Sequence, residues 1–297
     1  MARYLGLDGG GTSLRAVLID SAGQPLFHGQ SGAANIATTP EERFKNHLLK
    51  ATDGCPEPDA VCGCFAGLLT PDDRERAIRL LRERFPKACL RAEPDYVAAL
   101  EASGPEVTAC IVCGTGSLIC SRSEDGKYVR SGGGGYLLGD DGSGFQYGRA
   151  ALRHYLEVGP EGASDDLRRA VLERFGVSEP HSVTRTVYSF SGPAPMIARL
   201  LPAFVADLHA GEPYAAEALR EQSAKLARVV AGHLTRYHGN LDRAILTLAG
   251  GLWEPSIRFR EALAESLRDA WTGQIEMKRI PEPPVRGAAR LALALEA

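Results

Sequence analysis

The chain has 297 residues, of which 44% are hydrophobic, and this is enough to bury one large core or two domains. Its formal net charge of -3 gives no general attraction to nucleic acid or to anionic membranes. No uncharged apolar run approaches about 20 residues, and no basic segment followed by an apolar one opens the chain. We therefore expect a cytoplasmic protein without a nucleic-acid or membrane partner.

The first third of the chain predicts alternating strands and helices. In chain order, we expect a hairpin sheet at residues 4–30, a helix at 40–53, a strand at 60–65 and a helix at 71–85. Arginines alternate with glutamates over residues 74–84, a pattern typical of a solvated helix face. Asp95 precedes a run of helix formers and is expected to cap a short helix.

The remainder begins with an apolar strand at residues 107–113. Leucines and valines then recur at helical spacing over residues 212–237 and predict a long helix. A strand is expected at residues 244–249, and a final helix at residues 285–295 follows a proline-rich segment.

Residues 7–13 read Leu-Asp-Gly-Gly-Gly-Thr-Ser between two strand-like runs, and we call this segment the glycine turn. Gly10 and Gly11 leave backbone N–H groups open to an approaching phosphate. Asp8 precedes them and can hold a hydrated Mg²⁺, while Thr12 can add a hydroxyl donor. Together these residues favour a nucleoside triphosphate site, with a purely structural turn as the alternative.

Two better-known phosphate loops fit this segment poorly. The Walker loop requires Gly-Lys-Ser/Thr at the start of a helix, but no lysine follows Gly11. The dinucleotide fingerprint requires a glycine where Leu14 stands, and then a helix, whereas residues 14–20 are strand-like.

Two other strand ends consist of small residues. Gly114, Thr115 and Gly116 follow an apolar strand and offer a second phosphate clamp. Gly250 and Gly251 end the strand at residues 244–249, where a flat adenine ring could lie against bare backbone.

The seven cysteines do not form a metal-binding pattern. Cys110 and Cys113 are an odd number of positions apart in a strand, so their thiols should point to opposite faces. Cys62 and Cys64 should share a face, but no second pair accompanies them. The histidines are scattered, and buried reduced thiols are the expectation.

These segments, in this order, resemble those of the sugar kinase/actin/Hsp70 ATPase superfamily. From residue 5 to about 293 the chain resembles the N-acetylglucosamine kinase branch of the BadF/BadG/BcrA/BcrD ATPases. The resemblance implies an α/β fold with two actin-like (ribonuclease H-like) domains and a nucleotide and sugar cleft between them. The first domain would span residues 1–106, with the helix at 285–297 packing back on it, and the second would span 107–284. A homodimer is also implied.

By the same resemblance, Asp95 matches the catalytic aspartate, which orients the sugar hydroxyl and takes its proton. Asp8 would hold Mg²⁺ through water. The residues implied to bind ATP are Gly10, Gly11, Thr12, Gly114, Thr115, Gly116, Gly250 and Gly251.

The sugar site is implied by two loops. Asn35 matches a sugar-contacting asparagine, although an asparagine in a Ser/Gly/Ala loop is otherwise a turn former. Residues 132–144, which we call the glycine loop, open with a run of four glycines, continue with an acidic pair and lead into a helix expected to begin near Phe145. Here Asp140 matches a sugar-binding aspartate and residues 133–135 (Gly133, Gly134 and Gly135) match backbone contacts to the sugar, which Ser117 would also help to orient. Relatives often carry an aromatic residue and a histidine where Gly134 and Tyr136 stand.

The function implied is phosphorylation of the 6-hydroxyl of N-acetylglucosamine by MgATP. Glucosamine is the alternative acceptor, because the two departures from the family pattern fall in the glycine loop. A low-turnover sensor of sugar and ATP is a second alternative. A third is an activator of a 2-hydroxyacyl-CoA dehydratase, for whose iron–sulfur cluster we find no convincing cysteine pair.

Overall fold

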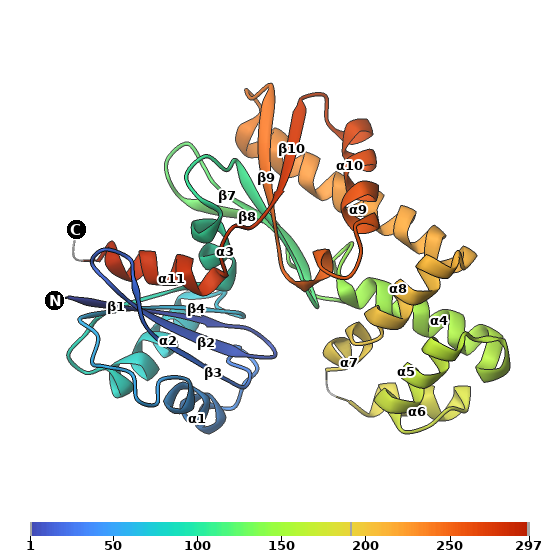
Figure 1. Cartoon of the computed structure of the whole chain (residues 1–297), viewed down its shortest axis with the longest axis horizontal. Helices are drawn as coiled ribbons and strands as arrows, with labels where there is room; N and C mark the ends of the chain where they lie inside the picture. Colours follow the sequence, from blue (N-terminus) through green and yellow to red (C-terminus); the bar gives the residue numbers. More distant parts are fainter. Residues whose placement is uncertain (1, 191, 296–297) are drawn as a thin grey trace. The chain divides into compact units, whose positions relative to one another are not determined.

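The computed structural model describes residues 2–190 and 192–295. The chain divides into two compact units: unit 1 comprises Met1–Cys110 and Arg279–Ala297, and unit 2 comprises Ile111–Lys278. Each unit contains one five-stranded sheet with helices (Figure 1). The α/β class predicted from the sequence is therefore confirmed.

The sheet of unit 1 has the strand order β3-β2-β1-β4-β5. Strands β1, β2 and β3 form an antiparallel meander, and β4 and β5 continue from β1 in parallel. This arrangement confirms the predicted hairpin sheet and the predicted strand at residues 60–65. The strand bounds are β1 (Arg3–Gly9), β2 (Leu14–Asp20), β3 (Pro25–Ser31), β4 (Ala60–Phe65) and β5 (Cys89–Pro94).

Helices cover both faces of this sheet. Helices α1 (Glu41–Ala51) and α2 (Pro71–Arg84) lie on one face, and α3 (Asp95–Ser103) and α11 (Pro284–Leu293) pack together on the other. Helix α11, from the end of the chain, lies beside β1 (Figure 1). A Cβ at Gly6 would lie only 2.3 Å from the backbone nitrogen of Ala289, so only glycine permits this approach.

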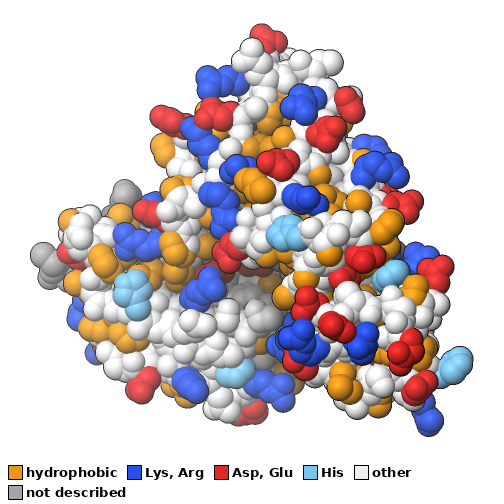
Figure 2. Space-filling model, turned by 45° about the vertical axis from the view of Figure 1, so that its right-hand side comes forward, with side chains coloured by type: hydrophobic (Ala, Val, Ile, Leu, Met, Phe, Trp, Pro, Cys, Tyr) orange, Lys and Arg blue, Asp and Glu red, His pale blue; other side chains and the backbone are white. Residues whose placement is uncertain are grey.

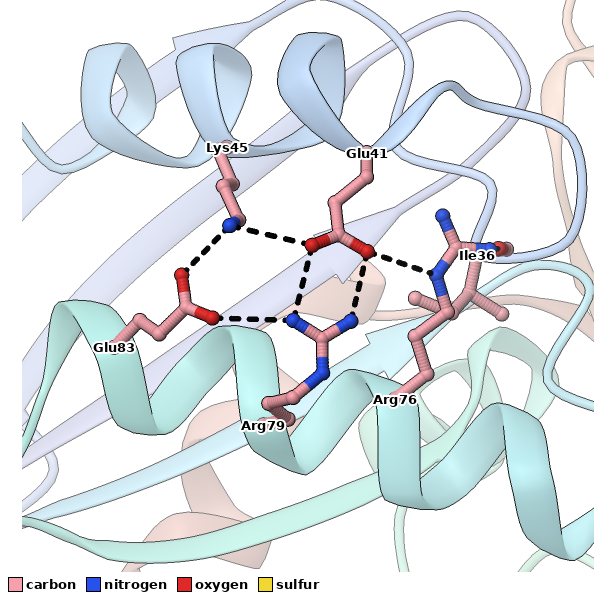
Figure 3. A network of polar contacts seen from close by, with 6 residues as sticks. All are labelled: Ile36, Glu41, Lys45, Arg76, Arg79 and Glu83. Atoms are coloured by element: carbon pink, nitrogen blue, oxygen red, sulfur yellow. Dashed lines mark hydrogen bonds and ion pairs between the residues drawn. The ribbon is translucent and has the colours of Figure 1, made fainter.

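An exposed ion-pair network joins α1 to α2 (Figure 3). Arg79 donates to both carboxylate oxygens of Glu41 at 2.9 and 2.7 Å, and Lys45 pairs with Glu83 at 2.9 Å. These cations lower the pKa of Glu41 to about 2. Because these side chains are solvent-accessible, the prediction of a solvated basic face at residues 74–84 is confirmed.

The sheet of unit 2 has the order β10-β9-β6-β7-β8. Read from the other edge, this order is β8-β7-β6-β9-β10. In both units, therefore, the third, second and first strands of the unit are followed by its fourth and fifth. The repeated order is the duplicated plan that an actin-like fold implies. The bounds are β6 (Ala109–Cys113), β7 (Ser117–Arg122), β8 (Tyr128–Gly132), β9 (Arg243–Ala249) and β10 (Gln274–Arg279).

Most of unit 2 outside its sheet is helical. The long helix predicted at residues 212–237 is α9 (Pro213–His238). An aromatic cluster fills the helical core, with the Tyr147 ring 5.0 Å from Phe204 and 4.9 Å from Phe259. The other helices are α4 (Gly144–Gly162), α5 (Asp165–Phe175), α6 (Pro180–Ser189), α7 (Ala194–Ala198), α8 (Leu201–Ala210) and α10 (Arg258–Ala270).

Acidic and basic side chains alternate over the face drawn in Figure 2. This mixing agrees with the small net charge of -3. Among the described residues, no helix combines the length and apolar character needed to span a bilayer.

Candidate active site

Two of the predicted acidic residues lie at the carboxyl edge of the unit 1 sheet. In the parallel part of the sheet, Gly9 is in register with Phe65, and Phe65 with Pro94. Asp8 stands one residue before Gly9, and Asp95 directly follows Pro94. The register therefore brings Asp8 and Asp95 to one edge, which is where open α/β sheets bind their ligands.

The two carboxylates influence each other electrostatically. Burial, and then the negative charge of Asp95, raise the pKa of Asp8 from 3.8 to about 7. The Arg15 guanidinium, whose residue lies opposite Asp8 on β2, lowers the pKa of Asp8. A divalent cation at this edge would remove the repulsion between the carboxylates.

Asp95 occupies the first turn of α3, but not the position that we expected from the sequence. The N-cap residue is Pro94, and Asp95 is the first helical residue. Its Oδ1 accepts a hydrogen bond from the Tyr96 N–H at 2.9 Å. The predicted Asp95 N-cap is therefore wrong by one residue, because a proline that needs no N–H partner takes that place.

The glycine turn is the connection between β1 and β2. The Gly10 N–H donates to the carbonyl of Ser13 at 2.9 Å, and the Ala34 N–H donates to the carbonyl of Gly10 at 3.0 Å. A Cβ at Gly11 would meet nothing within 4 Å, and none of these glycines adopts a positive φ. Glycine here supplies open space beside the backbone and not an unusual conformation. Thr12 is exposed at the same turn.

Asn35 lies in the loop that is tied to the glycine turn through Ala34. Its Oδ1 accepts hydrogen bonds from the N–H groups of Ala37 and Thr38 at 2.9 and 3.0 Å. The side chain is therefore the turn former that its sequence context favours. Because these bonds use the side-chain oxygen, they leave the role of its Nδ2 donor open.

In unit 2, the loop after β6 lies against the start of α4. The Gly144 N–H donates to the carbonyl of Gly114 at 2.8 Å, and the Phe145 N–H donates to Thr115 at 3.2 Å. A third bond, from Gly114 N–H to the Gly116 carbonyl at 2.9 Å, closes the loop. Thr115 is exposed at its tip.

Asp140 is fixed inside the glycine loop in an unusual conformation. Its φ of 56° is the one positive value among the described non-glycine residues. Its carboxylate accepts hydrogen bonds from the backbone N–H groups of Ser117 and Gly135, while burial raises its pKa. A Cβ at Gly116 would lie 2.7 Å from the Asp140 Oδ2, so glycine is required there.

Three of the five predicted sugar residues of unit 2 line one cavity of about 240 Å³, and Gly133 and Gly135 are not part of its lining. Ser117, Gly134 and Asp140 lie along its wall, and Leu226 and Val229 of α9 form an apolar side. The Ser117 hydroxyl donates to the carbonyl of Asp141 at 2.6 Å. Ser117 thus holds the loop in place through its side chain.

The two glycines after β9 differ in whether a side chain could replace their hydrogen. Gly250 has a φ of 94°, and a Cβ there would lie 2.2 Å from the carbonyl oxygen of Cys113. Gly251 is exposed, and a Cβ there would meet nothing within 4 Å. Gly250 therefore packs the sheet, and Gly251 is the better candidate for a surface beside a ligand.

Each unit gathers its own set of predicted site residues. Unit 1 holds Asp8, the glycine turn, Asn35 and Asp95, and unit 2 holds the remaining ones. Sequence reasoning missed Arg15, although a hairpin with four connecting residues places it opposite Asp8. It also missed Gln222 and His233, which contact residues in or beside the glycine loop.

The cysteines are free thiols, as expected from the sequence. The thiols of Cys62 and Cys64 contact each other at 3.9 Å, which confirms that they share a face of β4. The seven cysteines all lie in the described part of the chain, and none forms a disulfide. Within residues 2–190 and 192–295, no three His, Cys, Asp or Glu side chains gather as a metal site would require.

The unit 1 residues fit a magnesium nucleotide. Mg²⁺ usually binds one or two carboxylates and keeps several waters and phosphate oxygens, so Asp8 with its neighbour Asp95 supplies a sufficient donor set. The space beside Gly10 and Gly11 would be filled by any larger side chain.

Comparison with known proteins shows the family of the chain. The model of the BadF/BadG/BcrA/BcrD ATPase family matches residues 5–292. The chain belongs to this ATPase family. The family model thus spans both units, and with them every predicted site residue.

Two curated relatives are amino-sugar kinases. N-acetyl-D-glucosamine kinase from Dictyostelium discoideum is 29% identical over 209 residues, which cover 62% of this chain and 64% of that protein. Glucosamine kinase GspK from Vibrio cholerae is 29% identical over 164 residues, covering 52% of this chain and 55% of that protein. The matched segments thus span less than two thirds of either relative.

A solved structure extends the likeness in fold to nearly the whole chain. The ROK family glucokinase from Streptomyces griseus, in complex with glucose and AMPPNP, superposes with a TM-score of 0.61 at 18% identity. The match covers 98% of this chain and 99% of that one. This likeness establishes the sugar-kinase fold and leaves the substrate to be argued from the residues.

Proposed function

We propose that this protein is an ATP-dependent kinase that phosphorylates the 6-hydroxyl of N-acetylglucosamine. One observation carries the proposal: the parallel register of β1, β4 and β5 brings Asp8 and Asp95 to the sheet edge that also bears the glycine turn. A carboxylate pair beside an open phosphate loop suits phosphoryl transfer, in which the protein mainly positions groups and balances charge.

In this proposal Asp95 is the catalytic residue. Its carboxylate would orient the sugar hydroxyl and accept its proton as the hydroxyl oxygen attacks phosphorus. When bound, MgATP supplies the transferred phosphoryl group. Asp8 would hold the metal ion through water, and Arg15 keeps part of the Asp8 population ionised by lowering its pKa.

Each unit offers its own loop for the phosphates of a nucleotide. Gly10, Gly11 and Thr12 offer exposed or half-exposed backbone and a hydroxyl, and residues 114–116 offer a second short loop. Gly251 would lie beside adenine, while Gly250 fixes the backbone before it. We accordingly propose that the two units are the actin-like ATPase domains expected from the sequence.

The sugar would be oriented by Asn35 and Asp140. Asn35 can donate through Nδ2, and the Asp140 carboxylate retains acceptor capacity beyond its two backbone bonds. Residues 133–135 would contact the sugar through the backbone, and Ser117 would act by holding Asp141 in place.

Glucosamine is the second candidate acceptor, and the cavity beside the glycine loop favours it. Its lining includes the acidic residues Asp140 and Asp141 and, among the described residues, no Lys or Arg. Such a wall suits the ammonium group of an unacetylated amino sugar. Gly134 and Tyr136, which stand where relatives carry an aromatic residue and a histidine, point the same way.

A coupled assay of ADP release over hexoses and hexosamines tests the proposal. We expect N-acetylglucosamine or glucosamine to exceed glucose by at least about tenfold in kcat/KM, the effect of one well-made buried hydrogen bond. The 6-deoxy analogue of the preferred sugar should inhibit without being phosphorylated. Comparable turnover of glucose would refute the amino-sugar assignment, and sugar binding without turnover would identify a sensor.

We carry over the homodimer as a further proposal from the family resemblance. Light scattering of the purified protein would measure a mass of about twice the 31.8 kDa of the chain if it holds.

A further inference from the structure

One stripe of helix α9 underlies the glycine loop. Gln222, Leu226, Val229 and His233 follow each other at spacings of four, three and four residues, so they lie on one face of the helix. Leu226 and Val229 line the cavity beside Asp140. The two polar members at the ends of the stripe, Gln222 and His233, are buried, with 4% and 1% of their surface exposed.

Gln222 holds the far end of the glycine loop. Its Oε1 accepts a hydrogen bond from the Gly142 N–H at 3.1 Å. A Cβ at Gly142 would lie 2.9 Å from the Cβ of Leu226, so the backbone there is pressed against the helix. The loop end is thereby fixed two residues after Asp140.

His233 holds the near end of the loop. Its Nδ1 lies 2.9 Å from the hydroxyl of Ser131, the residue directly before the glycine loop. Its Nε2 lies 2.9 Å from the hydroxyl of Ser121 on β7, which also contacts the Nε2 of His238 at 2.9 Å. A neutral imidazole has one donor and one acceptor nitrogen. The three hydrogen bonds of the Ser131–His233–Ser121–His238 chain can therefore all form at once, with each group donating to the next.

Between the end of β8 at Gly132 and Gly142, the loop consists of turns and irregular segments with a few main-chain hydrogen bonds, such as that from the Gly133 N–H to the carbonyl of Ser117 at 3.0 Å. Gly132, Gly133, Gly135, Asp140 and Gly142 all have positive φ values. A segment of this kind has many alternative conformations when its ends are released, and ordering it again would cost binding free energy.

We propose that Gln222 and His233 are positioning residues that fix the two ends of the glycine loop and so set the affinity for the sugar. The assignment of this effect to the sugar rests on the proposed function. Neither side chain touches the reacting atoms in this proposal. They act through Gly142 and Ser131, and hence on the placement of Asp140.

Single substitutions can release each end separately. Gln222→Met keeps the length of the side chain but removes the acceptor for Gly142. His233→Gln keeps a polar group near the Nε2 position, toward Ser121, and loses the bond to Ser131. We expect each to raise the KM for the sugar by about tenfold, as for one buried polar group left unpaired, while kcat and the KM for ATP stay within about twofold.

Two further variants separate positioning from general stability. His233→Asn keeps a polar group near the Nδ1 position, toward Ser131, and should restore most of the sugar affinity. Ser256→Ala removes a different His–Ser bond of unit 2, between His209 and Ser256 at 3.0 Å, and should leave the KM for sugar unchanged. Equal effects of Ser256→Ala and His233→Gln, or equal changes in both KM values, would overturn the proposal.

Hydrogen exchange gives a readout that does not depend on the identity of the sugar. Amides of the glycine loop should exchange faster in Gln222→Met and His233→Gln than in the wild-type protein, and Ser131→Ala provides a milder variant should His233→Gln fold poorly. Unchanged exchange would refute the positioning role. Faster exchange in a protein that phosphorylates no sugar would refute the proposed function while retaining the two contacts.

Discussion

Unit 1 holds its glycine turn with main-chain hydrogen bonds, whereas unit 2 adds buried side chains to the main-chain hydrogen bonds of its glycine loop. In unit 1, the bonds from Gly10 N–H to Ser13 and from Ala34 N–H to Gly10 suffice. In unit 2, Gln222 and His233 reach the loop region from positions 80 and 102 residues away in sequence. A tight hairpin fixes its own turn, while a long irregular loop depends on groups supplied by distant elements.

The glycines also differ between the glycine turn and the glycine loop: some provide space beside the backbone, and others permit a positive φ. Gly10 and Gly11 of the glycine turn lack positive φ values and leave room beside the backbone. Several of those in the glycine loop have positive φ values, as does Asp140. Substitution should therefore affect ligand binding in unit 1 and loop conformation in unit 2.

The largest expected effect is on kcat and concerns the Asp95 carboxylate of unit 1. Asp95→Asn should lower kcat by about 10²–10⁴, the range for a positioned general base, and leave binding of ATP and sugar within a few-fold. Steady-state kinetics and calorimetry would measure both. Asp125→Asn, in an exposed turn of unit 2, is the matched control. An unchanged kcat would leave Asp95 as a structural residue of α3.

Unit 2 should contribute binding where unit 1 contributes chemistry. Asp140→Ala should raise the KM for the preferred sugar by about tenfold or more, because a buried partner of a sugar hydroxyl or amine is lost. Its affinity for ATP, measured by calorimetry, should stay near the wild-type value. Asp140→Asn tolerates the left-handed backbone and should retain more stability than Asp140→Ala. Sugar turnover independent of Asp140 would remove it from the site.

Two glycine substitutions test the distinction between space and conformation. Gly11→Val should keep the fold and weaken MgATP binding by about tenfold, since the side chain would occupy the space beside the turn. Gly250→Leu should instead lower the Tm, because its φ is 94° and its Cβ would collide with the Cys113 carbonyl. Gly251→Leu is the control that keeps the fold and raises the KM for ATP. Normal nucleotide binding by Gly11→Val would exclude the glycine turn as the phosphate site.

The smallest effect is a difference in pH dependence. The pKa of Asp8 is raised from 3.8 to about 7, so its contribution to stability is present at low pH and is lost as the pH rises through this range. Burial lowers the pKa of His233 from 6.5 to about 4, so its contribution is present above pH 6.5 and is lost as the pH falls toward 4.

Thermal unfolding between pH 4 and pH 7.5 would separate these two contributions. Relative to the wild-type protein, Asp8→Asn should gain stability as the pH rises, and His233→Asn should gain stability as the pH falls. Parallel pH profiles for the wild-type protein and both variants would contradict the opposite pH dependence of the Asp8 and His233 contributions to stability.

The local features of the fold were predictable from the sequence. The hairpin sheet, β4, α9 and α11 follow from short-range periodicity and turn residues, and these elements were expected close to their observed bounds. Strands β5, β7, β8 and β10 were missed, because five or six residues with few strand formers give weak periodicity. The expected N-cap at Asp95 differed by one residue, since Pro94 fills the cap position.

The candidate site was predictable only in part. Asp8 could be placed because it adjoins the end of a predicted strand, and Asp95 because it opens a predicted helix and matches the family's catalytic aspartate. Their coupling required the parallel register of β1, β4 and β5. Gln222 and His233 could not be found, because a polar residue on a helical stripe gives no sign of its partner until the distant loop is placed against it.

The close contact between Gly6 and Ala289 bears on how the chain is made. Strand β1 precedes unit 2 in the chain, while α11, the helix that covers β1, follows it. Residues 111–278 form an uninterrupted unit that can fold before α11 has been synthesised. Until then, one face of the first sheet lacks α11, so the nascent chain must keep that surface from aggregating.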